Sequence, residues 1–560
     1  MTSYKLIDLF AGAGGLSAGF KQTKKFEVVG AIEINEAAQK TYVQNHGSDA
    51  DLILKSRENN KSDITKIDFK TVLNDLNLKS REVVIVGGPP CQGFSNANRQ
   101  KNYLISGNNQ LVKEYVRAID EIRPIGFVME NVKTMNSETH KFFVTKDRNN
   151  IVKDYSSAQH LKEISNGERL FSEDRIELIS TSKLPEALIT PFNKLEEVPN
   201  PIINNIELLT RLKTLQQRFT KHKLIELKNK KEKNEVIKIV ELLETYHTKN
   251  NVVKEISNGV KRLLETILTN PNSCTDTVYP LILFNEYNRF LTRCQELKDE
   301  FIECPHLIIS KESDKTKVQA VVYSYNVVTY LEYVFKYFGY KITSGVLNSS
   351  DYGVPQKRNR FIIMGVINSK TEIELPTKTT PQPFTVEDAI KDLEDIPPQK
   401  WVEGYNEEIY DYRGINFDST LRKYYRQASK INVLPNHINT NSSSLIQKRF
   451  DEIRKTNGKN FHSLSIELQS TYEDASRTQN TVYLRLSYDK PSPTVINVRK
   501  SMWQHPTKAR ALSIREAARL QSFQDWFVFH GRKDEQYQQV GNAVPPLLAK
   551  AIAEKLLFYL

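Results

Sequence analysis

The stretch DLFAGAGGL, residues 8–16, is a glycine-rich turn that follows a short apolar run. We expect that run, Tyr4–Phe10, to form a β-strand, and we expect a helix after the turn. Glycines at such a turn let the backbone come close to a ligand at the helix N-terminus, where unpaired N–H groups point outward. The pattern predicts an open α/β sheet with a ligand at this turn, and a glycine-rich turn without a ligand is the alternative.

The residues after the turn discriminate between nucleotide cofactors. A dinucleotide site has the pattern Gly-x-Gly-x-x-Gly, and here Ser17 occupies the last position. Glu33 follows a second predicted strand, Glu27–Ile32, where its carboxylate can accept hydrogen bonds from both hydroxyls of a ribose. A ribose site without a pyrophosphate cradle favours S-adenosylmethionine over NAD. Asp63 can bond an adenine amine or can cap a helix.

A second loop carries a cysteine. The predicted strand Glu82–Val86 runs into GGPPCQGFS, residues 87–95, so Cys91 lies just beyond the carboxyl end of a parallel strand, where open α/β sheets bind ligands. A buried structural cysteine would lie in an apolar segment, and Cys91 is surrounded by proline, glycine and polar residues. A further strand, Gly126–Met129, leads into Glu130 and should bring that carboxyl group to the same edge.

A thiolate and a carboxyl group at one sheet edge suit chemistry on a cytosine ring. Addition of a thiolate to C6 makes C5 enamine-like, and a protonated carboxyl group can relieve the charge at N3. Arg358 and Arg360 alternate with Asn359, so they face one side of an extended segment and are candidate donors to the base O2. From these residues alone, two alternatives to a catalytic site stay open. Cys91 and Glu130 can be a chance pairing of a loop cysteine with a surface glutamate, and Arg358 and Arg360 can be ordinary surface arginines.

Composition sets limits on the remaining possibilities. The 560 residues suggest two or three domains, and the formal net charge of +12 suits a polyanionic partner or an inert basic surface. The four cysteines form no Cys-x-x-Cys pair, so we expect no structural zinc, no other metal site and no disulfide framework. The N-terminus lacks a signal-peptide pattern and no apolar run is long enough to span a bilayer, so we expect a cytoplasmic protein that makes no membrane contact.

The pattern changes at about residue 137. From there to about residue 320 the chain is rich in Lys, Glu, Asn and Leu at helical spacing, which predicts a long helical insertion. Its basic run, Lys221–Lys233, is interpreted as a solvated helix face, with a DNA-contacting arm as the alternative. The α/β pattern resumes with a predicted helix, Tyr330–Phe338, and strands Lys341–Leu347 and Phe361–Val366.

Six motifs in order resemble the DNA cytosine-C5 methyltransferase family of prokaryotic restriction-modification systems. They are Phe10-Ala11-Gly12-x-Gly14-Gly15, Pro90-Cys91-Gln92, Glu130-Asn131-Val132, Gln356-x-Arg358-x-Arg360, the block 515–523 and the block 539–546. The resemblance covers residues 1–136 and 320–560. It implies an α/β fold with a Rossmann-like, S-adenosylmethionine-dependent catalytic domain, a smaller target-recognition domain, and the long, mainly helical insertion as an addition.

The resemblance also divides the chain. Residues 1–136 and 321–369 would form the catalytic domain, interrupted by the insertion 137–320, whose role it leaves open. Residues 370–510 would form the target-recognition domain, and 511–560 would support it and return to the catalytic domain. The candidate base-reading or phosphate-binding residues of the recognition region are Trp401, Tyr405, Tyr410, Tyr412, Arg413, Arg422, Arg426, His437, Asn439 and Arg449.

Roles for site residues follow from the same resemblance. Cys91 would add to C6, Glu130 would contact N3 and the exocyclic amine, Arg360 would lie near O2, and Arg358 would support the site. The target base must leave the helix stack, and the loop Asn96–Asn109 would close over it. The predicted S-adenosylmethionine site consists of Phe10, Gly12, Gly14, Gly15, Glu33, Ile34, Asp63, Ile64, Pro89, Leu111 and Asn542.

The implied reaction is methyl transfer from S-adenosylmethionine to cytosine C5 within a specific sequence of double-stranded DNA. The enzyme would act as a monomer on DNA in the nucleoid and protect it from a cognate restriction endonuclease that acts separately. Two alternatives stay open. One is the tRNA-cytosine branch of the same family, and the other is a catalytically silent DNA-binding regulator.

Overall fold

The computed structural model describes residues 3–47, 49–90, 108–137, 140–146, 155–222, 225–269, 278–400, 419–427, 434–472 and 474–560. The chain forms two compact units. The first comprises Met1–Ser95, Asn108–Ser137 and Leu331–Leu560, and the second comprises Asn96–Gly107 and Glu138–Tyr330.

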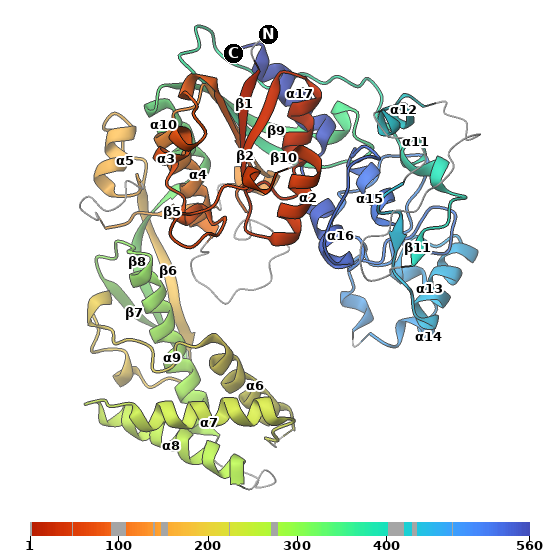
Figure 1. Ribbon diagram of the computed structural model, residues 1–560. Helices are drawn as coiled ribbons and strands as arrows, with labels where there is room; N and C mark the ends of the chain where they lie inside the picture. The colour runs from red at the N-terminus through yellow and green to blue at the C-terminus, as the bar shows by residue number, and fades with distance from the viewer. Residues whose placement is uncertain are drawn as a thin grey trace. The chain divides into compact units, whose positions relative to one another are not determined.

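A six-stranded sheet in the order β2-β1-β3-β4-β10-β9 is the frame of the first unit (Figure 1). Its strands are β1 (Tyr4–Leu9), β2 (Phe26–Ile32), β3 (Val83–Gly87), β4 (Gly126–Val132), β9 (Tyr340–Asn348) and β10 (Asn359–Ile367). All six predicted strands are present. The strands β1 to β4 are parallel, as the sequence analysis expected. The direction of the later strands was left open, and β10 runs antiparallel to both β4 and β9. A short connection between neighbouring strands, as between β9 and β10, reverses the chain direction.

Helices cover both faces of this sheet. On one face, Leu6, Val86 and Ile362 pack in a common core with residues of α1 (Gly15–Gln22) and α17 (Pro546–Leu557). On the other face, Phe127 contacts the aromatic rings of Tyr115 and Phe335. These rings come from α4 (Asn108–Ile122) and α10 (Val327–Tyr337). Two further helices, α2 (Glu36–His46) and α3 (Phe69–Asp75), lie between β2 and β3 in the sequence.

The end of the chain returns to its beginning, as predicted (Figure 1). A Cβ atom on Gly15 would lie 2.2 Å from the carbonyl oxygen of Val544, and one on Gly19 would lie 2.4 Å from that of Pro546. Two glycines one turn apart therefore let α1 and α17 approach backbone to backbone. The Tyr4 hydroxyl donates to the Leu560 carbonyl at 3.0 Å, which fixes the last residue beside β1.

The rest of the first unit is irregular and relies on aromatic packing. Trp503, Phe523, Phe527 and Tyr537 are buried in one core with the start of α1. The regular elements around this core are short: α11 (Val386–Ile390), β11 (Gln399–Lys400), α12 (Thr420–Arg426), β12 (Ile438–Asn439), α13 (Ser444–Lys455), α14 (Ile466–Gln469), α15 (Ile514–Leu520) and α16 (Lys533–Asn542).

The second unit, by itself, combines a sheet with helices. Its antiparallel strands are β5 (Lys141–Phe143), β6 (Ser172–Thr181), β7 (Leu307–Glu312) and β8 (Lys315–Asn326), and β8 pairs with the other three. Its helices are α5 (Ala158–Ile164), α6 (Ile206–His222), α7 (Lys230–Thr245), α8 (Asn251–Thr269) and α9 (Tyr279–Asp299). The sequence analysis missed this sheet because it relied on the Lys-, Glu-, Asn- and Leu-rich composition of the whole segment. The β-branched and aromatic residues of β8 are the local signal that could have predicted a strand.

None of the helices in the described residues is both long enough and apolar enough to cross a membrane.

Replacement of Gly19 by alanine tests the approach of α1 to α17. The new methyl group would meet the Pro546 carbonyl and the Ala549 Cβ, both at 2.4 Å, and neither can move without displacing the helix. Overpacking of this kind costs about 1–3 kcal/mol, which thermal or urea unfolding would detect. The matched control is Gly345→Ala, whose methyl group would meet only the flexible end of Leu375. Equal stability of the two variants would contradict this description of the helix pair.

Candidate functional site

The glycine-rich turn after β1 adopts a conformation that requires its glycines. Phe10, Gly12 and Gly14 all have positive φ angles, at 57°, 55° and 87°. A Cβ atom on Gly14 would lie 2.2 Å from the Nε2 atom of His46, which in this structure forms a 3.0 Å hydrogen bond with the Gly14 carbonyl. A Cβ atom on Gly12 would meet nothing within 4 Å. The turn is therefore supported from behind at Gly14 and open at Gly12.

Glu33 and Ile34 lie beside the open part of the turn. The Glu33 carboxylate accepts hydrogen bonds from the backbone amides of Gly12 at 2.8 Å and Asn35 at 2.7 Å. Burial raises the pKa of Glu33, and these two amides oppose the increase. Ile34 leaves 72% of its surface exposed, which is unusual for a large aliphatic side chain. A carboxylate next to an exposed apolar side chain can bind a ribose and the base attached to it.

Other predicted cofactor residues have local roles that the structure defines. Asp63 caps a short 3-10 helix by accepting hydrogen bonds from the amide and the hydroxyl of Thr65, at 3.1 and 2.9 Å. Ile64 is buried, and Leu111 is half-buried on α4. Asn542, the last residue of α16, is exposed and accepts a hydrogen bond from Gln538 at 2.7 Å.

The ends of β3 and β4 meet at the edge of the sheet that carries this turn. Asn131 donates to the Pro89 carbonyl at 3.0 Å, and a Cβ atom on Gly88 would lie 2.7 Å from the Oε2 atom of Glu130. Glu130 is therefore adjacent to the backbone that leads to Cys91. Cys91 itself lies outside the described residues, as do residues 92–107, which include most of the predicted closing loop Asn96–Asn109.

Glu130 forms a buried ion pair with Arg360 of β10. Each residue exposes only 8% of its surface. The antiparallel register sets Arg360 opposite Val132 and Ile362 opposite Glu130, which brings a motif from more than 200 positions later in the sequence to this edge. Burial raises the pKa of Glu130, while the Arg360 guanidinium opposes the increase. The protonated carboxyl group therefore persists to higher pH than in water and can act as a proton donor.

Arg358 is directed into the protein. Its guanidinium donates to the carbonyl of Val495 at 2.7 Å and to that of Gly541 at 2.9 Å. Gln356 makes similar links, donating to Gln521 at 2.9 Å and accepting from the Val495 amide at 2.6 Å. These two side chains bind the start of β10 to the C-terminal motifs. The sequence analysis assigned no role to Gln356, although its spacing of two from Arg358 indicated a shared face.

Asp8 is a further residue that the sequence analysis did not single out. It is buried at the end of β1, where the hydroxyl of Ser17 donates to it at 2.6 Å and that of Tyr42 at 3.5 Å. Burial raises the pKa of Asp8 to about 7. The contact links β1 to α1 directly beneath the glycine-rich turn.

The candidate DNA-reading residues divide into several groups. Trp401, Tyr405, Tyr410, Tyr412 and Arg413 lie outside the described residues. Arg422 donates to the Glu387 carbonyl, and Asn439 is half-buried at a second, shallow pocket. His437 and Arg449 are buried, so they are poor candidates for contact with DNA. Arg449 donates to the Leu468 carbonyl, the Thr471 hydroxyl and, at 3.0 Å, the Tyr483 hydroxyl.

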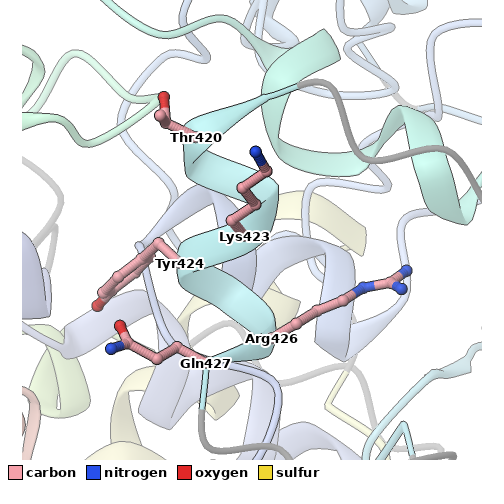
Figure 2. A pocket seen from close by; sticks show the side chains of 5 residues that line it. All are labelled: Thr420, Lys423, Tyr424, Arg426 and Gln427. Atoms are coloured by element: carbon pink, nitrogen blue, oxygen red, sulfur yellow. The ribbon is translucent and has the colours of Figure 1, made fainter.

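Helix α12 presents a shallow pocket of about 740 Å³. Figure 2 shows Lys423 directed away from the helix, with Tyr424 and Gln427 on one side and Arg426 on the other. Arg426 pairs with Asp392 at 2.9 Å, and Tyr424 hydrogen-bonds to Gln22 of α1 and to the Ser522 carbonyl. Lys423 is exposed, so it is the basic side chain of this helix that an anionic ligand can reach most easily.

Comparison with known proteins places the chain in a family. The model of the family described as C-5 cytosine-specific DNA methylase matches residues 4–281 and 322–557. The chain belongs to that family. The match spans the glycine-rich turn, Glu130, Arg360 and the C-terminal motifs, and it includes part of the second unit.

Curated relatives are similar to part of this chain at moderate identity. The type II methyltransferase M.DdeI of Desulfomicrobium norvegicum is 33% identical over 244 residues, which are 40% of this chain and 56% of that protein. The type II methyltransferase M1.HphI of Haemophilus parahaemolyticus is 33% identical over 223 residues, which are 40% of this chain and 50% of that protein. The chain thus spans about half the length of the curated relatives that it matches.

Solved structures give a weaker likeness. A protein described as a DNA modification methyltransferase encoded within an E. coli prophage matches 100% of this chain and 99% of its own at 17% identity, with a TM-score of 0.48.

The buried position of Arg449 predicts that its replacement affects stability and leaves DNA-sequence choice unchanged. Arg449→Met would leave the Leu468 carbonyl without its donors, at a cost of about 1–3 kcal/mol. The exposed Lys423→Met is the control and should unfold like the wild type. A changed set of methylated sites in Arg449→Met, with unchanged unfolding, would show that Arg449 reads DNA.

Proposed function

We propose that this chain transfers a methyl group from S-adenosylmethionine to C5 of cytosine in a specific sequence of double-stranded DNA. The observation that carries the proposal is the buried Glu130–Arg360 pair beside Gly88 and Pro89, immediately before Cys91 in the chain. Membership of the C-5 cytosine-specific DNA methylase family supports the same reaction.

The residues at the glycine-rich turn fit S-adenosylmethionine. Gly12 leaves open space where a side chain would otherwise lie, and Glu33 and Ile34 offer a carboxylate and an apolar surface next to it. These residues would hold the adenosine, with Phe10, Gly14, Gly15, Asp63, Ile64, Pro89, Leu111 and Asn542 as the remaining proposed contacts. When bound, S-adenosylmethionine supplies a methyl group that is activated by its positively charged sulfur.

The chain's own residues would prepare the base for that methyl group. The Cys91 thiolate adds to C6 of the cytosine, and the Glu130 carboxyl group gives its proton to N3, so that no negative charge builds up on the ring. C5 then carries the electron pair that forms the new carbon–carbon bond. Loss of the C5 proton, which we assign to water, departure of the thiolate and return of the N3 proton to the Glu130 carboxylate restore the aromatic ring.

Arg360 has two proposed tasks in this step. Its ion pair fixes the Glu130 carboxyl group. Its remaining N–H groups would donate to the base O2. Arg358 uses its guanidinium within the protein, and we assign it a positioning role through its bonds to Val495 and Gly541. Because Cys91 attacks the ring of a single base, the target cytosine must leave the duplex stack.

The biological role that fits this reaction is protection of DNA. Several relatives are named type II methyltransferases, the modifying half of restriction-modification systems. We propose that this chain works in the same way, as a monomer in the cytoplasm, beside a restriction endonuclease that acts separately.

Covalent trapping tests the proposed chemistry. DNA amplified with 5-fluorocytosine in place of cytosine contains every candidate sequence, and fluorine at C5 cannot leave as the proton does. We expect the wild type with S-adenosylmethionine to form a complex that survives denaturing electrophoresis, and Cys91→Ser to form none. Glu130→Gln should slow trapping by about 10²–10⁴-fold, the usual contribution of a general acid.

The control is Cys304→Ser, which replaces a buried cysteine of the second unit and should trap at the wild-type rate. Trapping of RNA and not DNA would assign the chain to the tRNA-cytosine branch. Failure of the wild type to trap either nucleic acid, while it still binds S-adenosylmethionine, would favour a silent regulator.

A further inference from the structure

One segment of the second unit holds much of the chain's net positive charge. Residues 211–240 contain ten Lys and Arg and three Glu, an excess of seven out of a net +12. The segment covers most of α6 and the first part of α7, which meet at one end of the unit (Figure 1).

Two of the three glutamates are turned inward and neutralised. Glu232 accepts from Arg211 at 2.8 Å and from Arg218 at 2.6 Å, and Glu235 accepts from Arg211 at 2.7 Å. Glu232 and Glu235 are buried, and the pKa of Glu232 falls to about 2 because Arg218 hydrogen-bonds to its carboxylate. The network therefore joins α6 to α7 and removes the negative charge from the surface.

The lysines of the segment remain outside this network. In α7, the buried residues Val236, Ile239 and Leu243 face the core, and the lysines occupy the opposite arc. Lys231 approaches Glu235 at 3.8 Å and keeps 74% of its side chain exposed. For the other lysines, no carboxylate partner occurs in the part of the chain that the structure describes. The exposed lysines of the segment are Lys213, Lys221, Lys228, Lys230, Lys231, Lys233 and Lys238. We call the four that lie on α7, namely Lys230, Lys231, Lys233 and Lys238, the lysine face.

We propose that the lysine face binds the phosphate backbone of double-stranded DNA, independently of base sequence. The inference rests on the proposed function, which makes duplex DNA the substrate, and it assigns a role to the second unit. DNA carries one negative charge per about 1.7 Å of its axis, and the four lysines between residues 230 and 238 cover about 12 Å of helix, enough to meet several phosphates.

The side chains of this face favour a duplex over single-stranded nucleic acid. Binding of single strands depends on exposed aromatic rings on which bases stack. Among the described residues of α6 and α7, Phe219 is the one Phe, Tyr or Trp, and it packs against the core of the unit. Lysines that have no aromatic side chains beside them contact phosphates as point charges. Such contacts do not discriminate between bases.

A fourfold variant of the full chain, with Lys230, Lys231, Lys233 and Lys238 replaced by Gln, tests the inference. We expect its affinity for duplex DNA to fall at least about 10-fold at low salt, and equally for duplexes with and without the methylated sequence. The slope of log affinity against log salt should become shallower by about 3, as expected when several phosphate contacts are lost. Affinity for S-adenosylmethionine and the identity of the methylated sequence should not change.

The matched control removes the same charge from four other exposed lysines of the second unit. Three of them are next to an acidic residue in the sequence: Glu255, Glu312 or Asp314. Its substitutions are Lys249→Gln, Lys254→Gln, Lys311→Gln and Lys315→Gln. We expect its salt slope to stay close to that of the wild type. Equal losses of duplex affinity and of salt slope in the two variants would overturn the inference, because they would indicate a general effect of net charge.

Other outcomes separate this inference from the proposed function. If the wild type methylates DNA and the fourfold variant keeps its affinity and salt slope, the lysine face has no role in DNA binding while the proposed function stands. If the wild type binds no duplex and methylates none, both fail together. A loss of binding confined to an RNA duplex would overturn the choice of DNA as the ligand.

Discussion

The Glu130 carboxylate lies where the ends of β3 and β4 meet, in space that the glycine at position 88 leaves free. A Cβ atom there would lie 2.7 Å from the Glu130 carboxylate, and that carboxylate occupies the space instead. The Asn131–Pro89 hydrogen bond fixes the same junction from the other side, and Arg360 neutralises the buried charge. An uncompensated carboxylate at this depth would be costly, so the antiparallel β10 that carries Arg360 is a requirement of the site and not only an extra strand.

A second constraint joins the two ends of the chain. Gly15 and Gly19 let α1 pack against the backbone at Val544 and Pro546, and Arg358 and Gln356 bond the start of β10 to the same C-terminal region. The glycine-rich turn is thus supported by residues from the end of the sequence. The two ends of the chain therefore build one sheet and its helices together. For this reason a long internal insertion can interrupt the chain while the motifs on both sides of it stay in one unit.

The sequence predicted the parts of the fold that depend on local patterns. All six strands of the main sheet, α1, α10 and the return of the C-terminus were correctly expected from apolar periodicity and motifs. The reversed direction of β10 was not, since strand direction depends on pairing between segments that are distant in the sequence. The sheet of the second unit was missed because the polar composition of the whole segment outweighed the local run of β-branched and aromatic residues in β8.

The same distinction holds for the candidate site. Glu130 and Arg360 are together, as their motifs implied, whereas Arg358 points into the protein, because its partners Val495 and Gly541 lie far away in the sequence. Residue type alone also failed to distinguish residues that can contact DNA from buried structural residues. Arg449 and His437 were candidates for DNA contact because they are polar, yet both are buried. For Cys91 and the loop after it, the assignment remains a prediction from sequence, because these residues lie outside those that the structure describes.

Base-resolution sequencing of 5-methylcytosine tests the central claim most directly. Plasmid DNA would be taken from a host that lacks cytosine methylation and expresses either this chain or its Cys91→Ser variant. The account predicts that the wild type methylates cytosine within one short sequence throughout the plasmid and that the variant methylates none. Absence of 5-methylcytosine, from folded wild-type protein that binds S-adenosylmethionine, would contradict it.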